Sequence, residues 1–389
     1  MMVKSIQSIK DFKNKSILVR CDFDVPIVKI QNTNNKIQKY KISDDTRLKA
    51  NLETIKYLLN KRVKQIILIG HLGRPNGKVV QDLSLLPIKK YLEKILPKAP
   101  RYKIQFPNKF QIPNSNYRIL MLENIRFFKE EESNNKKFAK KLSKLADIYV
   151  NECFSTSHRF HASLDAIQNY LPSYAGLNLE KEIKNLYLDK IKKPLVLIIG
   201  GAKIETKLPV INNFINKADN ILLGGAVANN FLKALGFEVG KSLVDKKYLK
   251  QAQKIIKLKN NKLLLPIDTI TQDNKIKLLN KIKSTDRILD IGPKTQLLFN
   301  GIIKSAKIII WNGPMGYFED KNFKNGTEKI AENIFNNKKA KIIIGGGETI
   351  EVIKKYSNKV INGDIFISTG GGAMLEFLAG NSLPGLKRI

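Results

Sequence analysis

Residues 150–165, VNECFSTSHRFHASLD, gather side chains that can do chemistry. They include two of the three histidines of the chain, His158 and His161, with Arg159 between them, and one of the two cysteines, Cys153. Such residue types can form a metal centre, a nucleophile with its base, or a pocket for an anion. We distinguish the three possibilities by the spacing of these residues and by the residue types found beside them.

The metal and nucleophile hypotheses gain little from the spacing. Cys153, His158 and His161, even with Cys21 and His71 added, match no common zinc-ligand pattern. A nucleophilic pair of Cys153 and His158 lacks an identifiable third group to orient it and an oxyanion hole. Histidines that are only solvated, or satisfied within the core, remain the alternative for each histidine taken singly.

Arginines and histidines recur where the predicted strands of the first half end. The planar guanidinium matches phosphate and carboxylate oxygens two at a time, and each charge-assisted bond is worth roughly 1.5 to 3 kcal/mol. Several such groups converging on one crevice would hold a small, highly anionic metabolite, which is the favoured interpretation. These residues are Arg20, Arg47, His71, Arg74, Arg126, His158, Arg159 and His161.

Glycine dominates the corresponding positions of the second half. Four segments each follow a predicted strand and open a predicted helix, where glycine lets the backbone approach a phosphate and free N–H groups face it. One such loop alone is more often a structural turn, but four in one sheet favour a phosphate site. The segments are GGAKIETK (200–207), LLGGAVANN (222–230), GGGETI (345–350) and STGGGAML (368–375).

The elements that must position these groups are short apolar runs alternating with Lys-rich amphipathic stretches. Between the runs, residues 48–61 and 135–147 carry apolar side chains three and four apart, as in helices. Continuously apolar strands indicate parallel sheets covered on both faces, so we predict an α/β fold with doubly wound, Rossmann-like sheets. Ligands bind beyond the carboxyl ends of such strands. The runs are SILVR (16–20), QIILIG (65–70), RILML (118–122), DIYV (147–150), PLVLIIG (194–200), NILLGG (220–225), KLLLPID (262–268), RILDIG (287–292), KIIIWNG (307–313), KIIIGGG (341–347) and DIFIST (364–369).

Length and composition limit the class of protein. A chain of 389 residues exceeds the size at which one core usually stops growing, so two domains are expected, and residues 177–194 read as one helix that joins them. The net charge of +35 would suit a nucleic-acid partner, but the lysines are scattered without a basic block, which favours a general drift in composition. Two cysteines, no export signal and no apolar run near about 18 residues predict a cytoplasmic protein without a membrane span.

Nine motifs, taken in order, resemble those of phosphoglycerate kinase: RCDFDVP, HLGRP, ENIRFFKEEE, HRFHAS, GGAKIETK, DIGPKT, WNGPMGYFE, GGGET and STGGGA. The resemblance runs from residue 16 to residue 385. It implies two Rossmann-like domains joined by a helix and a hinge, and the direct in-line, reversible transfer of a phosphoryl group from 1,3-bisphosphoglycerate to MgADP after domain closure, in glycolysis. The implied parts are a glycerate-binding domain (1–173), an inter-domain helix (174–190), a nucleotide-binding domain (191–378) and a tail (379–389) that returns to the first domain.

The resemblance also implies the residues of the site. The glycerate would be bound by Asp22, Asp24, Arg47, His71, Arg74, Arg126, Arg159 and His161. The nucleotide would be bound by Gly200, Gly201, Lys203, Lys207, Gly224, Gly225, Asn312, Pro314, Glu319, Gly346, Gly347, Glu348 and Thr349. The phosphoryl group in flight would be stabilised by Arg47, Lys203 and the amides of Gly347, Gly371 and Gly372. Glu319 would accept from the ribose hydroxyls, and Glu348 would hold Mg²⁺.

The implied partners are small molecules, 3-phosphoglycerate or 1,3-bisphosphoglycerate and ADP or ATP, for a monomer without a specific nucleic-acid or membrane partner. The chain departs from the usual pattern at Asp24, where Asn is usual, at Glu348, where Asp is usual, and at Ala226, where Gly is frequent. We expect activity to survive all three. The alternatives are a nucleic-acid-binding protein that uses the positive charge, and a catalytically degraded member of the family that only binds.

Overall fold

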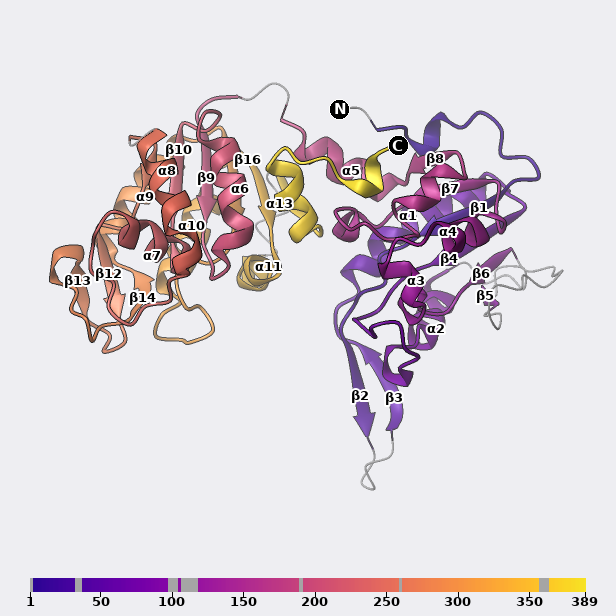
Figure 1. The fold of residues 1–389 in the computed structure, drawn as a ribbon, viewed down its shortest axis with the longest axis horizontal. Coiled ribbons are helices and arrows are strands. Elements are labelled where there is room, and N and C mark those ends of the chain that lie inside the picture. Colours follow the sequence, from indigo (N-terminus) through magenta and orange to yellow (C-terminus); the bar gives the residue numbers. More distant parts are fainter. Residues whose placement is uncertain are drawn as a thin grey trace. The chain divides into compact units, whose positions relative to one another are not determined.

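The computed structural model describes residues 3–31, 37–96, 104–105, 118–188, 192–258, 261–356 and 364–389. The chain divides into two compact units: unit 1 comprises Met1–Lys184 with Ser382–Ile389, and unit 2 comprises Asn185–Asn381. Each unit contains its own six-stranded sheet (Figure 1). In the described parts of the chain, no helix combines the length and the apolar character needed to cross a membrane.

The sheet of unit 1 is parallel and has the order β5-β6-β4-β1-β7-β8. Its strands are, in that order, β5 (Ile104–Gln105), β6 (Ile119–Met121), β4 (Gln65–Ile69), β1 (Ser16–Arg20), β7 (Ile148–Asn151) and β8 (Ser173–Ala175). The chain passes from β1 to β4 on one side and later returns to the other side of β1 with β7. The order of the strands therefore reverses between β1 and β7, and ligands bind beyond the carboxyl ends at such a point.

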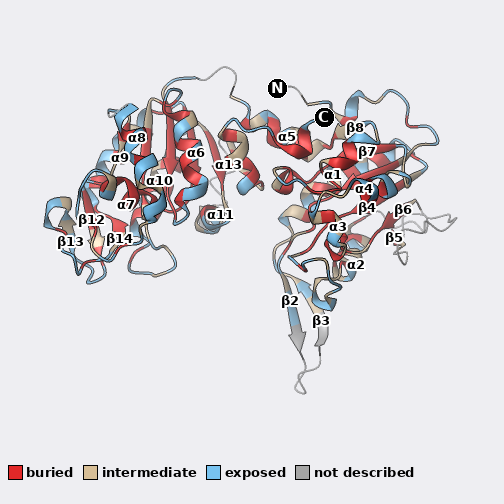
Figure 2. Cartoon of the chain, viewed as in Figure 1, coloured by how far each residue is buried: buried red, intermediate tan, exposed pale blue. Residues whose placement is uncertain are grey.

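Both faces of this sheet are buried, which explains the continuous apolar runs. Ile17 and Val19 of β1 belong to one core cluster together with Ile55 and Ile88 from two helices. Leu18, which lies between them and points to the opposite face, is equally buried (Figure 2). The α-helices of unit 1 are α1 (Thr46–Asn60), α2 (Leu86–Ile95), α3 (Lys129–Glu132), α4 (Lys136–Ser143) and α5 (Leu177–Leu186).

Unit 1 also contains a two-stranded antiparallel hairpin that the sequence pattern did not predict. Lys and Gln side chains interrupt its apolar residues, so no continuous run marks it. Its strands are β2 (Ile27–Gln31) and β3 (Ile37–Ile42), and the short 3-10 helices of the unit are η1 (Ile6–Ser8), η2 (Gln81–Leu83), η4 (Ile125–Phe127), η5 (Phe154–Thr156), η6 (Ala166–Asn169) and η10 (Pro384–Leu386).

The large sheet of unit 2 is also parallel and has the order β11-β10-β9-β15-β16-β17. Its strands are β11 (Leu263–Leu264), β10 (Asn220–Leu223), β9 (Leu195–Ile199), β15 (Ile308–Asn312), β16 (Lys341–Gly345) and β17 (Ile365–Ser368). Here the strand order reverses between β9 and β15. The helices are α6 (Ile204–Phe214), η7 (Lys246–Tyr248), α7 (Gly225–Ala234), α8 (Leu249–Leu258), η8 (Leu279–Lys281), α9 (Pro293–Ser305), α10 (Asn325–Asn336), α11 (Gly347–Ile353), η9 (Lys354–Tyr356) and α13 (Gly372–Leu378).

One of the predicted parallel strands was wrong and a second is confirmed only in its first part. The run RILDIG forms β14 (Ile288–Ile291), which pairs antiparallel with β12 (Asp268–Thr271) in a separate sheet completed by β13 (Ile276–Leu278). The run KLLLPID is divided at Pro266, because proline has no N–H to donate to a ladder and therefore does not continue a central strand. Its first part is the edge strand β11, and its last residue begins β12.

The helix predicted over residues 177–194 is shorter, because α5 ends at Leu186. The buried side of α5 consists of Leu179, Ile183 and Leu186, whereas Tyr187 is 42% exposed. Helices in proteins depend on the burial of an apolar face, and α5 ends at the last of these three buried side chains. Residues 189–191 lie outside the described residues, and β9 begins directly after Pro194.

The start of α5 is held by Glu152, which is 1% exposed. Its carboxylate accepts from the Thr54 hydroxyl at 2.8 Å and from the backbone N–H groups of Asn178 at 3.0 Å and Leu179 at 3.3 Å. Burial raises the pKa of Glu152 to about 8, although these hydrogen bonds act in the opposite direction. The carboxyl group therefore links β7, α1 and α5 and is protonated in the folded chain at neutral pH.

We expect the free energy of unfolding of the wild type to fall, relative to that of Glu152→Gln, as the pH rises from about 5 to about 8. The folded side chain keeps its proton up to about pH 8, whereas the unfolded one loses it near about pH 4.3. Folding therefore takes up a proton in this window, which costs up to about 1.4 kcal/mol per pH unit. Urea unfolding followed by far-UV circular dichroism measures the free energy of unfolding of both proteins at each pH. If the two free energies changed in parallel with pH, a protonated Glu152 in the folded chain would be contradicted.

Candidate functional site

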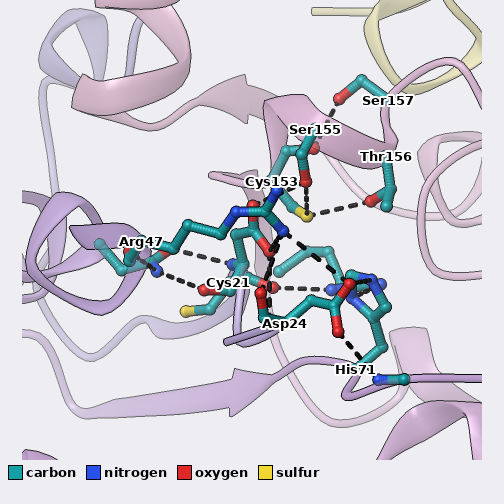
Figure 3. A network of polar contacts seen from close by, with 12 residues as sticks. Cys21, Asp24, Arg47, His71, Cys153, Ser155, Thr156 and Ser157 are labelled. Carbon is teal, nitrogen blue, oxygen red and sulfur yellow. Dashed lines mark hydrogen bonds and ion pairs between the residues drawn. The ribbon is translucent and has the colours of Figure 1, made fainter. Parts of the chain in front are cut away.

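The carboxyl ends of β1 and β4 bring acidic and basic side chains together in unit 1. Figure 3 shows Arg47, from the first turn of α1, and His71, which follows β4, directed toward Asp24. Nη1 of Arg47 donates to the carbonyl oxygen of Asp24 at 3.1 Å and lies 3.5 Å from Oδ1 of Asp22. Oδ1 of Asp24 accepts from the N–H of Gly73 at 2.9 Å. The side chain of Asp24 thus accepts one backbone hydrogen bond and lies 3.9 Å from Nη1 of Arg47, so its negative charge is placed beside a cation.

Arg20 lies fully buried at the end of β1 and holds its neighbours in the cluster by hydrogen bonds. Its guanidinium donates to Ser163 Oγ at 2.8 Å, to the carbonyl of Cys21 at 2.7 Å and to Nδ1 of His71 at 3.2 Å. Because arginine has no acceptor, Nδ1 of His71 must accept, so that the proton of the neutral ring sits on Nε2. His71 therefore presents an N–H donor on the side of Asp24, 3.9 Å from Oδ2.

The two buried histidines of the cluster are neutral in the free protein. Burial, followed by the charge of Arg20, lowers the pKa of His71 well below its ordinary value. Burial, followed by the charges of Arg126 and Arg20, lowers the pKa of His161 to about 3. An anion placed among these guanidinium groups would oppose both effects, so that its binding favours protonation of the rings.

The other basic residues predicted from the sequence differ in how far they are buried. Arg126 is 6% exposed and donates to the carbonyl of Gly73 at 2.8 Å. Arg74 and Arg159 extend into solvent, and His158 is half-buried. The structure thus brings Arg20, Arg47, Arg126, His71 and His161 into one charged neighbourhood, in which each affects the pKa of another. Arg159 adjoins this group, since its carbonyl accepts from the N–H of His161 at 3.1 Å and its charge contributes to the lowered pKa of His161.

A metal hypothesis can be tested on three side chains in this cluster. Ligand atoms of Asp22, His71 and Cys153 lie within 4.8 Å of one another. Burial raises the pKa of the Cys153 thiol, and the neighbouring charges of Arg20 and Arg47 repel a cation. The same charges attract an anion, so the electrostatics favour an anion site here.

Sequence reasoning missed several neutral residues that hold the cluster in place. Asn51 donates to the carbonyl of Asp22 at 2.9 Å and accepts from the N–H of Asp22 at 3.1 Å. Ser155 donates to Oδ2 of Asp22 at 2.6 Å. Asn51 lies four residues after Arg47 in a predicted helix, so the i,i+4 spacing that places both on one face could have identified it. Ser155 carries no comparable signal.

In unit 2 the reversal between β9 and β15 is built from backbone packed too closely for any side chain. A Cβ added to Gly200 would lie 1.9 Å from the carbonyl oxygen of Pro314, and one added to Gly313 would lie 2.3 Å from that of Gly200. Gly201 has a φ of 84° and its N–H donates to the carbonyl of Pro314 at 2.7 Å. Gly224 is equally constrained by Met315. These glycines are therefore needed to bring the two strand ends together.

All four glycine-rich loops follow strands of the same parallel sheet and lead into helices, as predicted. The loops follow β9, β10, β16 and β17 and lead into α6, α7, α11 and α13. Gly346 and Gly371 occupy the positions before α11 and α13 with positive φ values of 97° and 48°. Gly347 and Gly372 are the first residues of these helices.

Polar side chains behind these loops form a connected set. Lys207 donates to Oδ1 of Asn312, whose amide donates to the carbonyl of Gly345 at 2.8 Å. Burial, followed by the charge of Lys203, lowers the pKa of Lys207 to about 8, and Glu348 acts in the opposite direction. Thr349 is fully buried and its hydroxyl accepts from the N–H of Gly313. A phosphate bound beside this buried ammonium would raise its pKa again and hold it in the charged form.

A cavity of about 240 Å³ opens at this edge of the sheet. Five residues predicted to bind nucleotide line it: Gly201, Gly225, Pro314, Glu319 and Glu348. Gly200, Lys203, Lys207, Gly224, Asn312, Gly346, Gly347 and Thr349 are not among its lining residues.

The apolar part of the lining was not predicted. It includes Leu232, Leu243, Pro266, Ile288 and Met315, which come from separate elements and share no motif. A pocket lined by both apolar side chains and carboxylates is suited to a molecule that has one apolar and one polar portion.

Comparison with known proteins places the chain in a family. Residues 6–381 match the family model described as phosphoglycerate kinase. The chain is 43% identical over 396 residues to the phosphoglycerate kinase of Dictyoglomus turgidum, with 97% of this chain and 96% of the relative covered. It is 40% identical over 411 residues to that of Clostridium botulinum (strain Langeland), with 99% and 98% covered.

Solved structures agree with this result. The structure of phosphoglycerate kinase from Coxiella burnetii is similar with a TM-score of 0.85 at 33% identity and covers 99% of this chain and 98% of its own. That from Pyrococcus horikoshii is similar with a TM-score of 0.79 at 30% identity, with the same coverage. The relatives and the folds both extend over nearly the whole chain, and this chain therefore belongs to the phosphoglycerate kinase family.

Proposed function

We propose that the basic cluster of unit 1 binds the phosphoglycerate and that the cavity of unit 2 binds the nucleotide. The reaction of the family is the reversible transfer of a phosphoryl group from 1,3-bisphosphoglycerate to ADP, a step of glycolysis. Phosphoryl transfer needs positioning and neutralisation of charge rather than a covalent nucleophile. The observation that supports the assignment most is the set of guanidinium groups around two neutral histidines at the β1/β7 reversal.

For the glycerate, we propose that Arg47 contacts the phosphoryl group in flight, with Asp22 and Asp24 holding its guanidinium. The further ligands would be His71, Arg74, Arg126, Arg159 and His161. The N–H at Nε2 of His71 would donate to a substrate oxygen in place of its distant contact with Asp24. Bound anion would then be held by charge-assisted bonds, which are the stronger kind.

For the nucleotide, we propose that the helix N-termini after β9 and β10 face the phosphates, where free N–H groups and the helix dipole favour negative charge. Lys203, Lys207 and Asn312 would contact the transferring phosphoryl group, and the amides of Gly347, Gly371 and Gly372 would stabilise its charge. Glu319 would accept from the ribose hydroxyls. The remaining predicted ligands are Gly200, Gly201, Gly224, Gly225, Pro314, Gly346 and Thr349.

Glu348 is the proposed ligand of Mg²⁺. Its carboxylate lines the cavity and lies near enough to Gly201 that a Cβ added there would be 3.3 Å from Oε2. Mg²⁺ in phosphate sites is commonly held by one or two carboxylates, waters and substrate phosphates, so this donor fits the ion. When bound, the ion would neutralise phosphate oxygens, while Lys207 and the backbone amides orient them.

We further propose that the protein is a cytoplasmic monomer whose two units close during turnover, without a nucleic-acid or membrane partner. Direct transfer requires the acyl phosphate and the nucleotide to meet with water excluded, since water would hydrolyse the acyl phosphate.

A coupled assay tests the proposal as a whole. Purified protein should form ATP from 1,3-bisphosphoglycerate and MgADP. Folded protein that retains DNA with steep salt dependence and forms no ATP would instead support a nucleic-acid-binding role. Protein that binds both ligands without turnover would support the degraded, binding-only alternative.

Replacement of Arg47 by alanine should lower kcat by about 10² to 10³-fold while raising the KM for 3-phosphoglycerate much less, because the contact is made mainly in the transition state. Steady-state kinetics in the direction of ATP consumption measures both constants. Lys49→Ala is the matched control, since Lys49 lies on the same helix, has a side chain that is 64% exposed and forms an ion pair with Asp45. Equal losses in kcat and in glycerate affinity would contradict the assigned role of Arg47.

The histidine signals should report anion binding. In the free protein we expect His161 to titrate near pH 3 and His71 well below its ordinary range, so that neither changes charge between about pH 5.5 and 8. Addition of 3-phosphoglycerate should raise both pKa values because its negative charge favours the protonated rings. Two-dimensional NMR of the ring C–H groups is practicable because the chain has only three histidines. Titration of both rings near pH 6.5 in the free protein would contradict the buried cluster.

A further inference from the structure

The cavity of unit 2 contains one cation to which no role has been assigned, Arg287. It is the only lysine or arginine among the lining residues, and its side chain is exposed. Within the part of the chain that the structure describes, no residue forms a hydrogen bond or an ion pair with its guanidinium. Its planar fork of donors is therefore available to a ligand.

The position of Arg287 along the cavity follows from α7. This helix begins at Gly225, beside Gly201, and its ten residues span about 15 Å. The segment that follows its end pairs with Arg287, because Gly240 forms a β-bridge with Arg287 and the N–H of Ile288 donates to Ser242 Oγ at 2.8 Å. Arg287 thus lies toward the end of α7, away from the glycine turn where the phosphates are proposed to bind.

Much of the lining around Arg287 is apolar, and the buried carboxylate of Asp290 accepts from the N–H groups of Ile291 and Gly326. Leu243, Pro266 and Ile288 line the cavity with it. The adjacent carboxylate of Asp286 is engaged elsewhere, since Lys277 Nζ lies 2.7 Å from Oδ1 and the N–H of Lys283 lies 2.7 Å from Oδ2. An apolar slot with one free guanidinium at its rim suits a flat heteroaromatic ring that carries acceptors on its edge.

We infer that Arg287 biases the choice of nucleotide by donating to the edge of a 6-oxopurine, so that guanine and hypoxanthine nucleotides are favoured, relative to adenine nucleotides, more than they would be without it. This inference rests on the proposed assignment of the cavity to the nucleotide. Guanine presents two acceptors, N7 and O6, that match an arginine fork, whereas adenine presents N7 beside a donor amino group. With adenine, one donor of Arg287 has no acceptor, so Arg287 does not favour adenine nucleotides in the same way.

The test compares ADP, GDP and IDP as acceptors of the phosphoryl group from 1,3-bisphosphoglycerate. Arg287→Met keeps an unbranched stem without donors and should lower kcat/KM for GDP and IDP by about tenfold, with less than about a twofold change for ADP. Arg287→Lys keeps the charge without the fork and should recover only part of the loss. Lys283→Met, which removes an exposed charge from the same segment and does not line the cavity, should leave all three values unchanged.

Two outcomes would overturn the inference. Equal losses for the three nucleotides in Arg287→Met would indicate a contact with phosphate or ribose, and unchanged ratios would indicate that Arg287 does not touch the base. Calorimetry of ADP and GDP binding to the same variants gives the ratio of the two affinities even if turnover is absent. Absence of turnover with a shifted binding ratio would therefore count against the proposed catalytic function and leave the role of Arg287 supported.

Discussion

The burial of one guanidinium, that of Arg20, is the constraint on which the basic cluster depends. A buried charge that loses its partners costs several kcal/mol, so its donors must all be satisfied. Each of its three nitrogens has a partner, namely Ser163, the carbonyl of Cys21 and His71, and Ser163 in turn donates to the buried carboxylate of Glu131 at 2.6 Å. This arrangement keeps the His71 ring neutral and fixes which nitrogen carries its proton. The side chains that face a substrate are thus positioned by charges that never meet it.

The two proposed anion sites are built from different parts of the chain. Unit 1 uses long cationic side chains, which are braced by Asp22, Asp24 and Asn51. Unit 2 uses glycines so closely packed that backbone N–H groups can reach a ligand, with Lys207 as a buried ammonium whose pKa is lowered to about 8. Both arrangements lie at a reversal of strand order, where neighbouring strand ends diverge and leave room for a ligand.

Much of the fold could be predicted because strands buried on both faces leave continuous apolar runs, as in SILVR and KIIIWNG. Prediction failed where burial is partial or local: RILDIG forms an antiparallel strand, and the β2–β3 hairpin contains Lys and Gln. The catalytic candidates stand in contiguous motifs, and the resemblance could identify them. The apolar lining of the cavity, Asn51 and Ser155 could not be identified in that way, because they become neighbours of the site only when distant segments pack together.

Unit 1 is discontinuous in sequence, since Ser382–Ile389 belongs to it although all of unit 2 comes first. The final segment is bound there specifically: Asn151 donates to the carbonyl of Gly385 at 2.9 Å, and Gln168 donates to the carbonyl of Pro384 at 2.9 Å and accepts from the N–H of Arg388 at 2.8 Å. During synthesis, domains fold as they emerge from the ribosome, beginning with the N-terminal one. The first unit to be translated is therefore completed only after unit 2, because the side-chain amides of Asn151 and Gln168 bind residues that follow the whole of unit 2 in the chain.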